Sequence, residues 1–521
     1  MITIMKMCYF TKLTMTIVGL ILISSCNRTA NRPNILYIMS DDHTSQAWGI
    51  YGGILEDYVV NPNIERLAES GVVLDNCFCT NSICVPSRAS IMTGQYSHKN
   101  GVYTLGGHLD PDSLNVAKIL QNNGYQTAIF GKWHLKKEPA GFDKYMVLPG
   151  QGVYHNPVLK TKDNWEDNYG GGKEYKGFSS DVIANFSIEW LEQRDKEKPF
   201  FLMTHFKATH EPFDYPERHA DLYQDKEIPY PASLFDEGPQ ETGRLFAGQT
   251  LENLGYRYHQ ASIGPWWTDY PGLPFTVEGL ERNEARMKIY QKFIRDFMRC
   301  GAAIDDNIGK LLDYLDSSGL RDNTVVMYTA DQGYFLGEHG FFDKRMIYEE
   351  SLRMPFVISY PKEIKREWRM DDIILNIDFP SLFLDYAGIE QPESFQGTSF
   401  RKNLRGKTPD DWRETMYYRY WTNEGKRPAH LGIRNHRYKL ALMYGQPRKV
   451  DSIVPMPFER GWEFYDLEKD PKELHNAYND PEYKDVIKEM KEEILRQKEL
   501  YGDTDEGNDL ILKLIEEAWE R

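Results

Sequence analysis

Cysteine is scarce in this sequence, and its scarcity excludes a protein held together by disulfide bonds. Only six cysteines occur among 521 residues, and four remain once the N-terminal leader is set aside: Cys77, Cys79, Cys84 and Cys300. Such a small set does not form a disulfide framework. Cys77 and Cys79 flank Phe78 as they would on one face of a strand, and no partners for a Cys-x-Cys metal site lie nearby. We therefore expect buried free thiols.

Basic residues are also too few for a typical nucleic-acid-binding protein. The formal net charge is −16, whereas proteins that bind nucleic acids usually carry a basic face. The negative total does not exclude a polyanionic ligand, because a local basic pocket can lie on an acidic protein.

The sequence lacks a long apolar run. Its longest candidate, residues 16–23, is too short for a stable transmembrane helix and, because lysines precede it, is typical of a signal peptide. The tetrapeptide Ile-Ser-Ser-Cys that ends at Cys26 resembles a bacterial lipoprotein cleavage site, which predicts a signal at residues 1–26 and a lipid anchor on Cys26. A plain signal peptide is the alternative. Asn27 is not an aspartate, so nothing favours retention at the inner membrane, and we expect the periplasm or the outer-membrane surface.

Chain length and 41% hydrophobic content predict two domains, at residues 32–390 and 391–521. In the first, strands and helices alternate, which predicts an α/β fold with a predominantly parallel sheet flanked by helices. The predicted strands are residues 34–39, 72–79, 125–130, 200–206, 324–330 and 354–361. The predicted helices are residues 63–71, with Gly71 as C-cap, and 114–123, 178–193, 286–317 and 378–387.

Two other regions have a different pattern. Residues 214–274 are rich in proline, glycine and aromatics without regular periodicity, which favours a long insertion that packs over the site and shapes substrate access. Beyond residue 390, short strands are predicted at 414–420, 430–434, 438–444 and 463–466, before a charged helix at 481–501. This order indicates a smaller α+β domain with an antiparallel sheet.

Polar side chains follow four of the predicted strands. They are Asp41 and Asp42, Lys132 and His134, His210, and Asp331 and Gln332. Sites in open parallel sheets form at the carboxyl ends of the strands, so we expect these side chains to meet at one edge. Adjacent carboxylates suit a hard divalent cation. Lys132 and His134 are two residues apart and on extended backbone would point to the same side.

The stretch at residues 81–94 has the most distinctive pattern. Cys84 lies just ahead of Pro86, a residue favoured in the first turn of a helix, so the thiol is predicted at a helix N-terminus, which favours an anion. Arg88 adds a positive fork suited to an oxyanion. For an isolated cysteine, a structural buried thiol is the alternative.

The frame Cys84-x-Pro86-x-Arg88 resembles the signature of the type I sulfatases, and the resemblance runs from about residue 32 to residue 476. It implies an alkaline-phosphatase-like fold. It also implies that Cys84 becomes formylglycine (3-oxoalanine), made by a formylglycine-generating or an anaerobic sulfatase-maturating enzyme.

The resemblance also implies roles for the other site residues. Ca²⁺ is held by Asp41, Asp42, Asp331 and Gln332 together with the group derived from Cys84. The family often has asparagine where Gln332 stands, so the fourth ligand carries an extra methylene. Arg88 and Lys132 hold the aldehyde hydrate and a sulfate oxygen, His134 is the base, and His210 and Lys344 meet the leaving oxygen. We expect structural roles for His98, His205 and His339.

The sequence blocks look most like those of N-acetylglucosamine-6-sulfatases and their heparan-acting bacterial relatives. We expect a sulfated glycan from glycosaminoglycans or mucins as substrate, contacted by Gln151, His430 and Arg434. A uronate-2-O-sulfatase is the nearby alternative. An alkaline-phosphatase-like phosphodiesterase would normally have Thr or Ser at position 84. A non-catalytic glycan-binding lipoprotein is a third possibility, which the intact Cys84 frame and metal positions disfavour.

Overall fold

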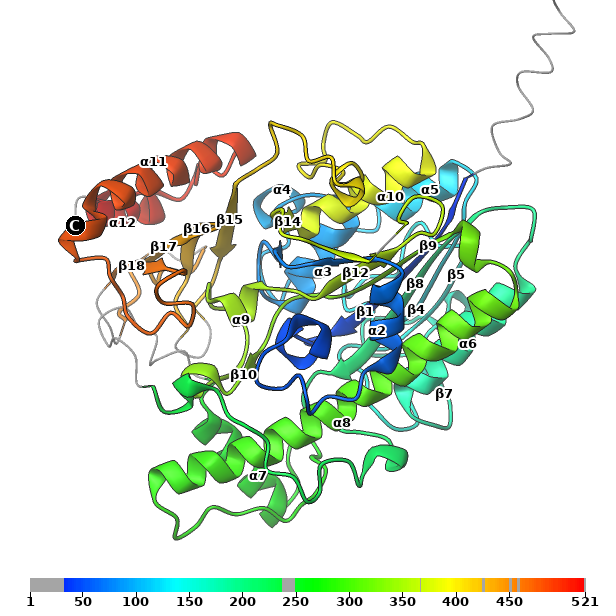
Figure 1. Ribbon diagram of the computed structural model, residues 1–521, viewed down its shortest axis with the longest axis horizontal. Helices are drawn as coiled ribbons and strands as arrows, with labels where there is room; N and C mark the ends of the chain where they lie inside the picture. The colour runs from blue at the N-terminus through cyan, green and yellow to red at the C-terminus, as the bar shows by residue number, and fades with distance from the viewer. Residues whose placement is uncertain are drawn as a thin grey trace, which may run out of the picture.

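The centre of the molecule is an eight-stranded sheet with strand order β13-β2-β12-β9-β1-β8-β4-β5 (Figure 1). The computed structural model describes residues 32–236, 249–365, 367–423, 427–448, 452–456 and 460–519. The strands are β1 (Asn34–Asp41), β2 (Val72–Leu74), β4 (Gln126–Gly131), β5 (Lys144–Val147), β8 (Phe200–Thr209), β9 (Thr324–Ala330), β12 (Phe356–Ser359) and β13 (Trp368–Met370). They pair in parallel, except that β12 is antiparallel to β2 and β9. The predicted, predominantly parallel sheet is confirmed.

Helices cover both faces of this sheet because its central strands are apolar on both sides. On β1, Tyr37 and Met39 belong to one hydrophobic core and Leu36 and Ile38 to another, as expected where side chains alternate. The first core includes α3 (Cys84–Thr93), α5 (Val116–Asn122) and α10 (Phe379–Ala387), and the second includes α2 (Pro62–Glu69), α6 (Ser179–Gln193) and α8 (Arg282–Ser317).

Gly71 does not have the predicted role of helix C-cap. Helix α2 ends at Glu69 with Ser70 as its C-cap. A Cβ atom on Gly71 would lie 2.4 Å from the carbonyl oxygen of Ile358 on β12. Glycine is needed here for close backbone approach rather than for a left-handed turn. The predicted strand at residues 72–79 is also interrupted, and forms β2 and the short β3 (Cys77–Phe78).

The insertion contains a helix that its composition concealed. Helix α7 (Leu251–Ile263) begins after Thr250, whose side chain accepts a hydrogen bond from the Asn253 amide. Its buried positions include Leu251, Leu254 and Tyr258, which recur at helical spacing and pack against α8. The sequence therefore concealed a helical periodicity within residues 214–274, and α7 was not predicted.

The C-terminal part forms the predicted antiparallel sheet. Its order is β15 (Thr415–Tyr420), β16 (His430–Asn435), β17 (Tyr438–Met443) and β18 (Gly461–Asp466), with α11 (Lys484–Tyr501) packed nearby (Figure 1). Helix α12 (Asp509–Trp519) was not predicted. Apolar residues of this sheet join the same core as α3 and α10.

The prediction of buried free thiols is confirmed, whereas the predicted lipid anchor is not tested. Cys77, Cys79, Cys84 and Cys300 are all buried and free, as predicted. Among the helices of the described ranges, none combines the length and apolar character that crossing a membrane requires. Cys26 and the predicted signal peptide lie outside the described residues.

Candidate active site

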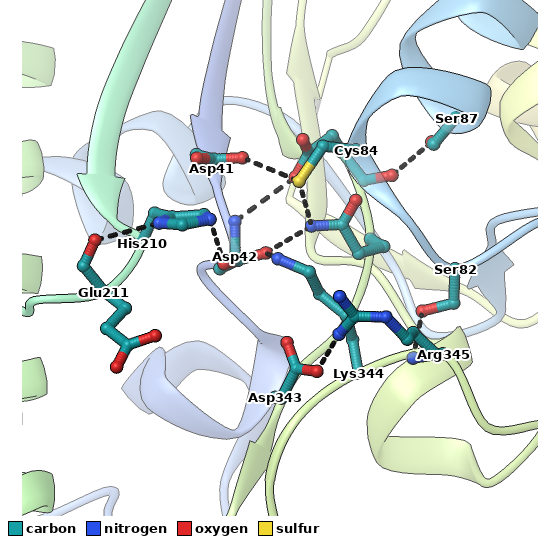
Figure 2. Close-up of polar contacts among 12 residues, drawn as sticks. Asp41, Asp42, Ser82, Cys84, Ser87, His210, Glu211, Asp343, Lys344 and Arg345 are labelled. Carbon is teal, nitrogen blue, oxygen red and sulfur yellow. Dashed lines mark hydrogen bonds and ion pairs between the residues drawn. The ribbon is translucent and has the colours of Figure 1, made fainter. Parts of the chain in front are cut away.

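The polar strand ends meet at one edge of the sheet. The four strands that carry them, β9, β1, β8 and β4, are consecutive neighbours, so the residues that follow them are adjacent in space. Figure 2 shows side chains from β1, α3 and the end of β8 converging on one centre. The convergence expected from the sequence is therefore present.

Three carboxylates form the middle of the centre. Asp41, Asp42 and Asp331 are at most 1% exposed, and one oxygen of each lies within 4.8 Å of the others. Asp42 has a φ of +67°, a region that non-glycine residues rarely adopt and that is enriched at functional sites. Its backbone N–H donates to Asp331 Oδ1 at 3.2 Å.

Cys84 is the first residue of α3 and faces this cluster. Its Sγ lies 3.4 Å from Asp41 Oδ1 (Figure 2). The same sulfur lies 3.9 Å from Gln332 Nε2. Burial, followed by the charge of Asp41, raises the pKa of the thiol well above its ordinary value. The predicted position of Cys84 at a helix N-terminus is confirmed.

Three cationic side chains balance the three carboxylates. Arg88 donates from Nε to Asp331 Oδ2 at 2.9 Å and from Nη2 to Asp41 Oδ1 at 3.3 Å. Lys132 contacts the other oxygen of Asp41, and Lys344 contacts Asp42. All three cations are at most 4% exposed. Such buried charges are tolerated because they are paired.

The carboxylates differ in proton affinity. Burial alone would raise the pKa of Asp41, but the charges of Lys132 and other nearby cations outweigh it and hold the pKa well below its ordinary value. Burial raises the pKa of Asp331 to about 7, although Arg88 opposes the change. Separated proton affinities within one cluster are typical of functional sites.

The two predicted catalytic histidines lie at this centre. Nε2 of His210 is 3.9 Å from Asp42 Oδ2, and Nδ1 is 2.9 Å from the carbonyl oxygen of Glu211. His134 is 7% exposed, and burial followed by the charge of Lys132 lowers its pKa. The backbone at Lys132 and His134 is not the extended segment considered from the sequence, because β4 ends at Gly131 and His134 has a φ of +56°.

The three predicted sugar-binding residues lie in different surroundings. Gln151 Oε1 accepts a hydrogen bond from Lys132 at the centre. His430 is fully buried, with its ring centroid 5.6 Å from those of Tyr418 and Tyr420. Arg434 pairs with Glu349 at 3.2 Å.

Arg434 also lines a cavity of about 310 Å³, whose lining includes Ser45, Glu349 and Lys472 but none of the cluster residues. In the described ranges, no hydrogen bond or ion pair joins His430 or Arg434 to the three carboxylates.

The histidines expected to be structural have partners of their own. His98 contacts the carbonyl oxygen of Tyr501, and His339 contacts Asp236. His205 Nδ1 lies 3.2 Å from the carbonyl oxygen of Lys132.

The donor set fits a hard divalent cation. Carboxylate oxygens of Asp41, Asp42 and Asp331 converge. The amide of Gln332 contacts Asp42 Oδ1 through its nitrogen, and its Oε1 is buried without a hydrogen-bond partner in the described part of the chain. Oxygen donors of this kind match the preference of Ca²⁺. An orphaned buried oxygen is costly unless a further group satisfies it.

Sequence reasoning missed two buried residues behind His210. Tyr154 donates from its hydroxyl to the carbonyl oxygen of His210, and Lys207 lies beside the Tyr154 ring. One signal was available: Lys207 interrupts the apolar run of a strand that is buried at every position. The contact with Tyr154 has no sequence signal, because it joins separate elements.

Comparisons with known proteins give matches along most of the chain. A family model described as Sulfatase matches residues 33–389, and one described as N-sulphoglucosamine sulphohydrolase, C-terminal, matches residues 337–500. A Bacteroides thetaiotaomicron protein named N-acetylglucosamine-6-O-sulfatase is 38% identical over 512 residues, covering 91% of this chain and 88% of the relative. A human N-acetylglucosamine-6-sulfatase is 25% identical, covering 75% of this chain and 67% of the relative.

One solved structure is similar across nearly the whole chain. It shows a protein in complex with its substrate, D-glucosamine-2-N,6-O-disulfate. It matches with a TM-score of 0.80 and 36% identity, covering 91% of this chain and 99% of that one.

Proposed function

This chain belongs to the sulfatase family, and from that premise we propose that it hydrolyses the 6-O-sulfate ester of N-acetylglucosamine units in sulfated glycans, such as heparan or mucin fragments. The observation that carries the proposal is the position of Cys84, whose thiol lies 3.4 Å from Asp41 in a carboxylate cluster matched by three cations. The names of the bacterial and human relatives support the choice of sugar and sulfate position.

We propose that Cys84 acts as formylglycine, whose hydrate supplies the attacking oxygen. Pro86 and Arg88 complete the Cys-x-Pro-x-Arg frame that resembles the recognition motif of the maturation enzymes. The thiolate is the reactive form of cysteine. Because burial raises the pKa of Cys84, the unconverted thiol is a poor nucleophile at neutral pH. This supports a function that depends on conversion.

The proposed metal is Ca²⁺, held by Asp41, Asp42, Asp331 and Gln332 together with the group derived from Cys84. When bound, it supplies a Lewis acid that polarises an ester oxygen. The convergent carboxylates and the orphaned Gln332 oxygen support this assignment.

The remaining roles follow from where charge develops as sulfate is transferred. Arg88 and Lys132 present positive charge where the sulfuryl oxygens would lie. His134 is the proposed base at the hydrate. His210 is the proposed acid that protonates the leaving sugar oxygen, assisted by Lys344. Burial, followed by the charge of Lys132, lowers the pKa of His210 well below its ordinary value.

For the sugar itself, Gln151 is the predicted contact with the strongest structural support, because its amide already touches Lys132. His430 and Arg434 remain proposed contacts. The burial of His430 and the pairing of Arg434 with Glu349 mean that either would need to rearrange to reach a sugar.

We further propose that the mature protein is anchored through a lipid on Cys26, in the periplasm or on the outer-membrane surface. The cleavage-site resemblance at residues 23–26 supports this location. The direct test is labelling of Cys26 by a lipid precursor, which should be lost in Cys26→Ala.

Sulfate release from a panel of sulfated sugars tests the function. The panel contains N-acetylglucosamine 6-sulfate and a 2-sulfated uronate disaccharide, and a separate assay measures phenol release from an aryl phosphodiester, which we expect to be absent. The enzyme is co-produced with a maturation enzyme. We expect sulfate from the first only, and none from Cys84→Ala or after chelation, whereas Cys77→Ala keeps activity. Release from the uronate alone would favour the 2-O-sulfatase alternative. Binding without release would favour the non-catalytic alternative.

A further inference from the structure

Two buried side chains outside the proposed chemistry hold the backbone around His210. The Tyr154 hydroxyl donates to the carbonyl oxygen of His210. The Lys207 ammonium lies 3.4 Å from the carbonyl oxygen of the next residue, Glu211. Tyr154 comes from the loop after β5 and Lys207 from β8, and both are at most 3% exposed. The two side chains come from separate elements and contact the backbone carbonyl groups of two consecutive residues, His210 and Glu211.

Lys207 is an unusual residue for a buried strand. Its ammonium lies 4.7 Å from the centroid of the Tyr154 ring, and within the described ranges no carboxylate forms an ion pair with it. Burial lowers the pKa of Lys207 to about 8. An ammonium buried without a carboxylate is costly for stability. Such violations of local rules are expected where a site has a functional requirement.

The carbonyl group of Glu211, which Lys207 contacts, also holds the imidazole ring of His210 in one orientation. A carbonyl oxygen only accepts hydrogen bonds, so Nδ1 of His210, 2.9 Å away, carries the hydrogen. Nε2 is left as the nitrogen that exchanges a proton. It points toward the carboxylate cluster, 3.9 Å from Asp42 Oδ2 (Figure 2).

We propose that Tyr154 and Lys207 are positioning residues that aim His210 Nε2 at the sugar oxygen released from sulfur. The inference rests on the proposed function, in which that oxygen takes a proton from His210 as its bond to sulfur breaks. The loop that carries Tyr154 also carries Gln151, which contacts Lys132. The same loop therefore contacts Lys132, proposed to bind a sulfate oxygen, and His210, proposed to protonate the leaving oxygen.

A positioning role has a signature that a structural role lacks. A sugar alkoxide is a poor leaving group and needs protonation, whereas the phenolate of an aryl sulfate leaves without it. Misaligning the acid should slow release from the sugar sulfate and spare the aryl sulfate. A loss of folded enzyme should reduce both rates by the same factor.

The experiment compares kcat for N-acetylglucosamine 6-sulfate and 4-nitrophenyl sulfate in Tyr154→Phe, Lys207→Met and His210→Ala. Each of the first two variants has a matched control. Tyr145→Phe removes a buried hydroxyl that donates to Glu138 at 2.5 Å, away from the centre. Lys160→Met removes a buried lysine that lies 3.7 Å from the Trp165 ring and donates to a backbone carbonyl.

We expect kcat for the sugar sulfate to fall roughly tenfold in Tyr154→Phe and Lys207→Met, by analogy with other groups that orient a functional residue. The aryl sulfate rate should change by less than about twofold, and both controls should match wild type. Combined with His210→Ala, Tyr154→Phe should cause no further loss, because the two residues act through one path.

Three outcomes would overturn the proposal. Equal losses for both substrates in Tyr154→Phe and Lys207→Met would indicate a structural role. Wild-type rates in those variants, while His210→Ala still loses the sugar sulfate selectively, would reject the positioning role and leave the proposed function intact. Equal losses for both substrates in His210→Ala would reject His210 as the acid and remove the basis for the proposal.

Discussion

The thiol of Cys84 lies 3.4 Å from Asp41 Oδ1, although the two residues are 43 positions apart. The contact joins the start of a buried helix to the end of the central strand. It sets the residue that becomes the proposed nucleophile against the carboxylates that would hold a cation. The proposed chemistry depends on this contact more than on any single motif.

Ca²⁺ should stabilise the folded protein, because the converging carboxylates bind it only in the folded state. At a free concentration of about one hundred times Kd, the gain is about 2.7 kcal/mol. We expect denaturation midpoints to rise with Ca²⁺ in wild type and to stop responding in Asp331→Asn. Asp296→Asn, which removes a carboxylate that is also buried but pairs with Lys292 on α8, should respond as wild type does. Equal responses in both variants would refute the site.

Gln332 should contribute its amide oxygen to the cation. Gln332→Leu removes that oxygen at similar volume, and we expect Ca²⁺ affinity to fall roughly tenfold or more. Gln332→Asn keeps an amide, shorter by one methylene, and should lose less. Calorimetric titration with Ca²⁺ measures both. A leucine variant that binds as tightly as wild type would exclude Gln332 as a ligand.

Much of this centre was predictable, because both the strand ends and the helix that begins at Cys84 are marked by short sequence patterns. Apolar strands followed by charged residues predicted a site at the carboxyl edge of the sheet. Pro86, just after Cys84, predicted the helix that faces this edge. The structure adds what local patterns do not encode. The antiparallel direction of β12 and the contact between Tyr154 and His210 arise from long-range packing. Helix α7 was not predicted because only a few apolar residues at helical spacing mark it, among many aromatic and proline residues nearby.

Arg88 should not be replaceable by lysine, because its guanidinium binds in three directions. It contacts Asp331, Asp41 and the carbonyl oxygen of Lys132 at 2.6 Å, a geometry that a single ammonium does not reproduce. We expect Arg88→Lys to lose about 3 kcal/mol of stability and nearly all sulfate release.

Arg413→Lys is the control for Arg88→Lys. Arg413 makes a two-armed contact with Asp378, away from the centre. This variant should lose stability but keep its activity per folded molecule. Full activity in Arg88→Lys would contradict the assigned role.

Asp503 should make stability depend on pH. Its carboxylate is 2% exposed and accepts from Arg419 Nη1 at 2.7 Å and from the Tyr417 hydroxyl at 2.6 Å. Burial would raise the pKa of Asp503, but Arg419 and then Lys498 outweigh it and hold the pKa below its ordinary value. The lowered pKa means that the stabilisation is present above about pH 4, the range in which the unfolded side chain is ionised, and is lost as pH falls.

Denaturation at pH 7 and at pH 3 measures this effect. Asp503→Asn should be about 3 kcal/mol less stable than wild type at pH 7, and the difference should shrink at pH 3. Asp316→Asn, which removes a half-exposed partner of Arg66, should cost less than about 1 kcal/mol at either pH. A difference for Asp503→Asn that grows on acidification would contradict the assignment.

The most direct test of the account is to measure, in the same preparations, the fraction of residue 84 present as formylglycine and the rate of sulfate release. Peptide mass spectrometry gives the fraction, and co-production with different amounts of a maturation enzyme varies it. We predict that release from N-acetylglucosamine 6-sulfate rises in proportion to the converted fraction and is zero when Cys84 is wholly a thiol. Sulfate release by fully unconverted protein, or none from fully converted protein with Ca²⁺ present, would contradict the account.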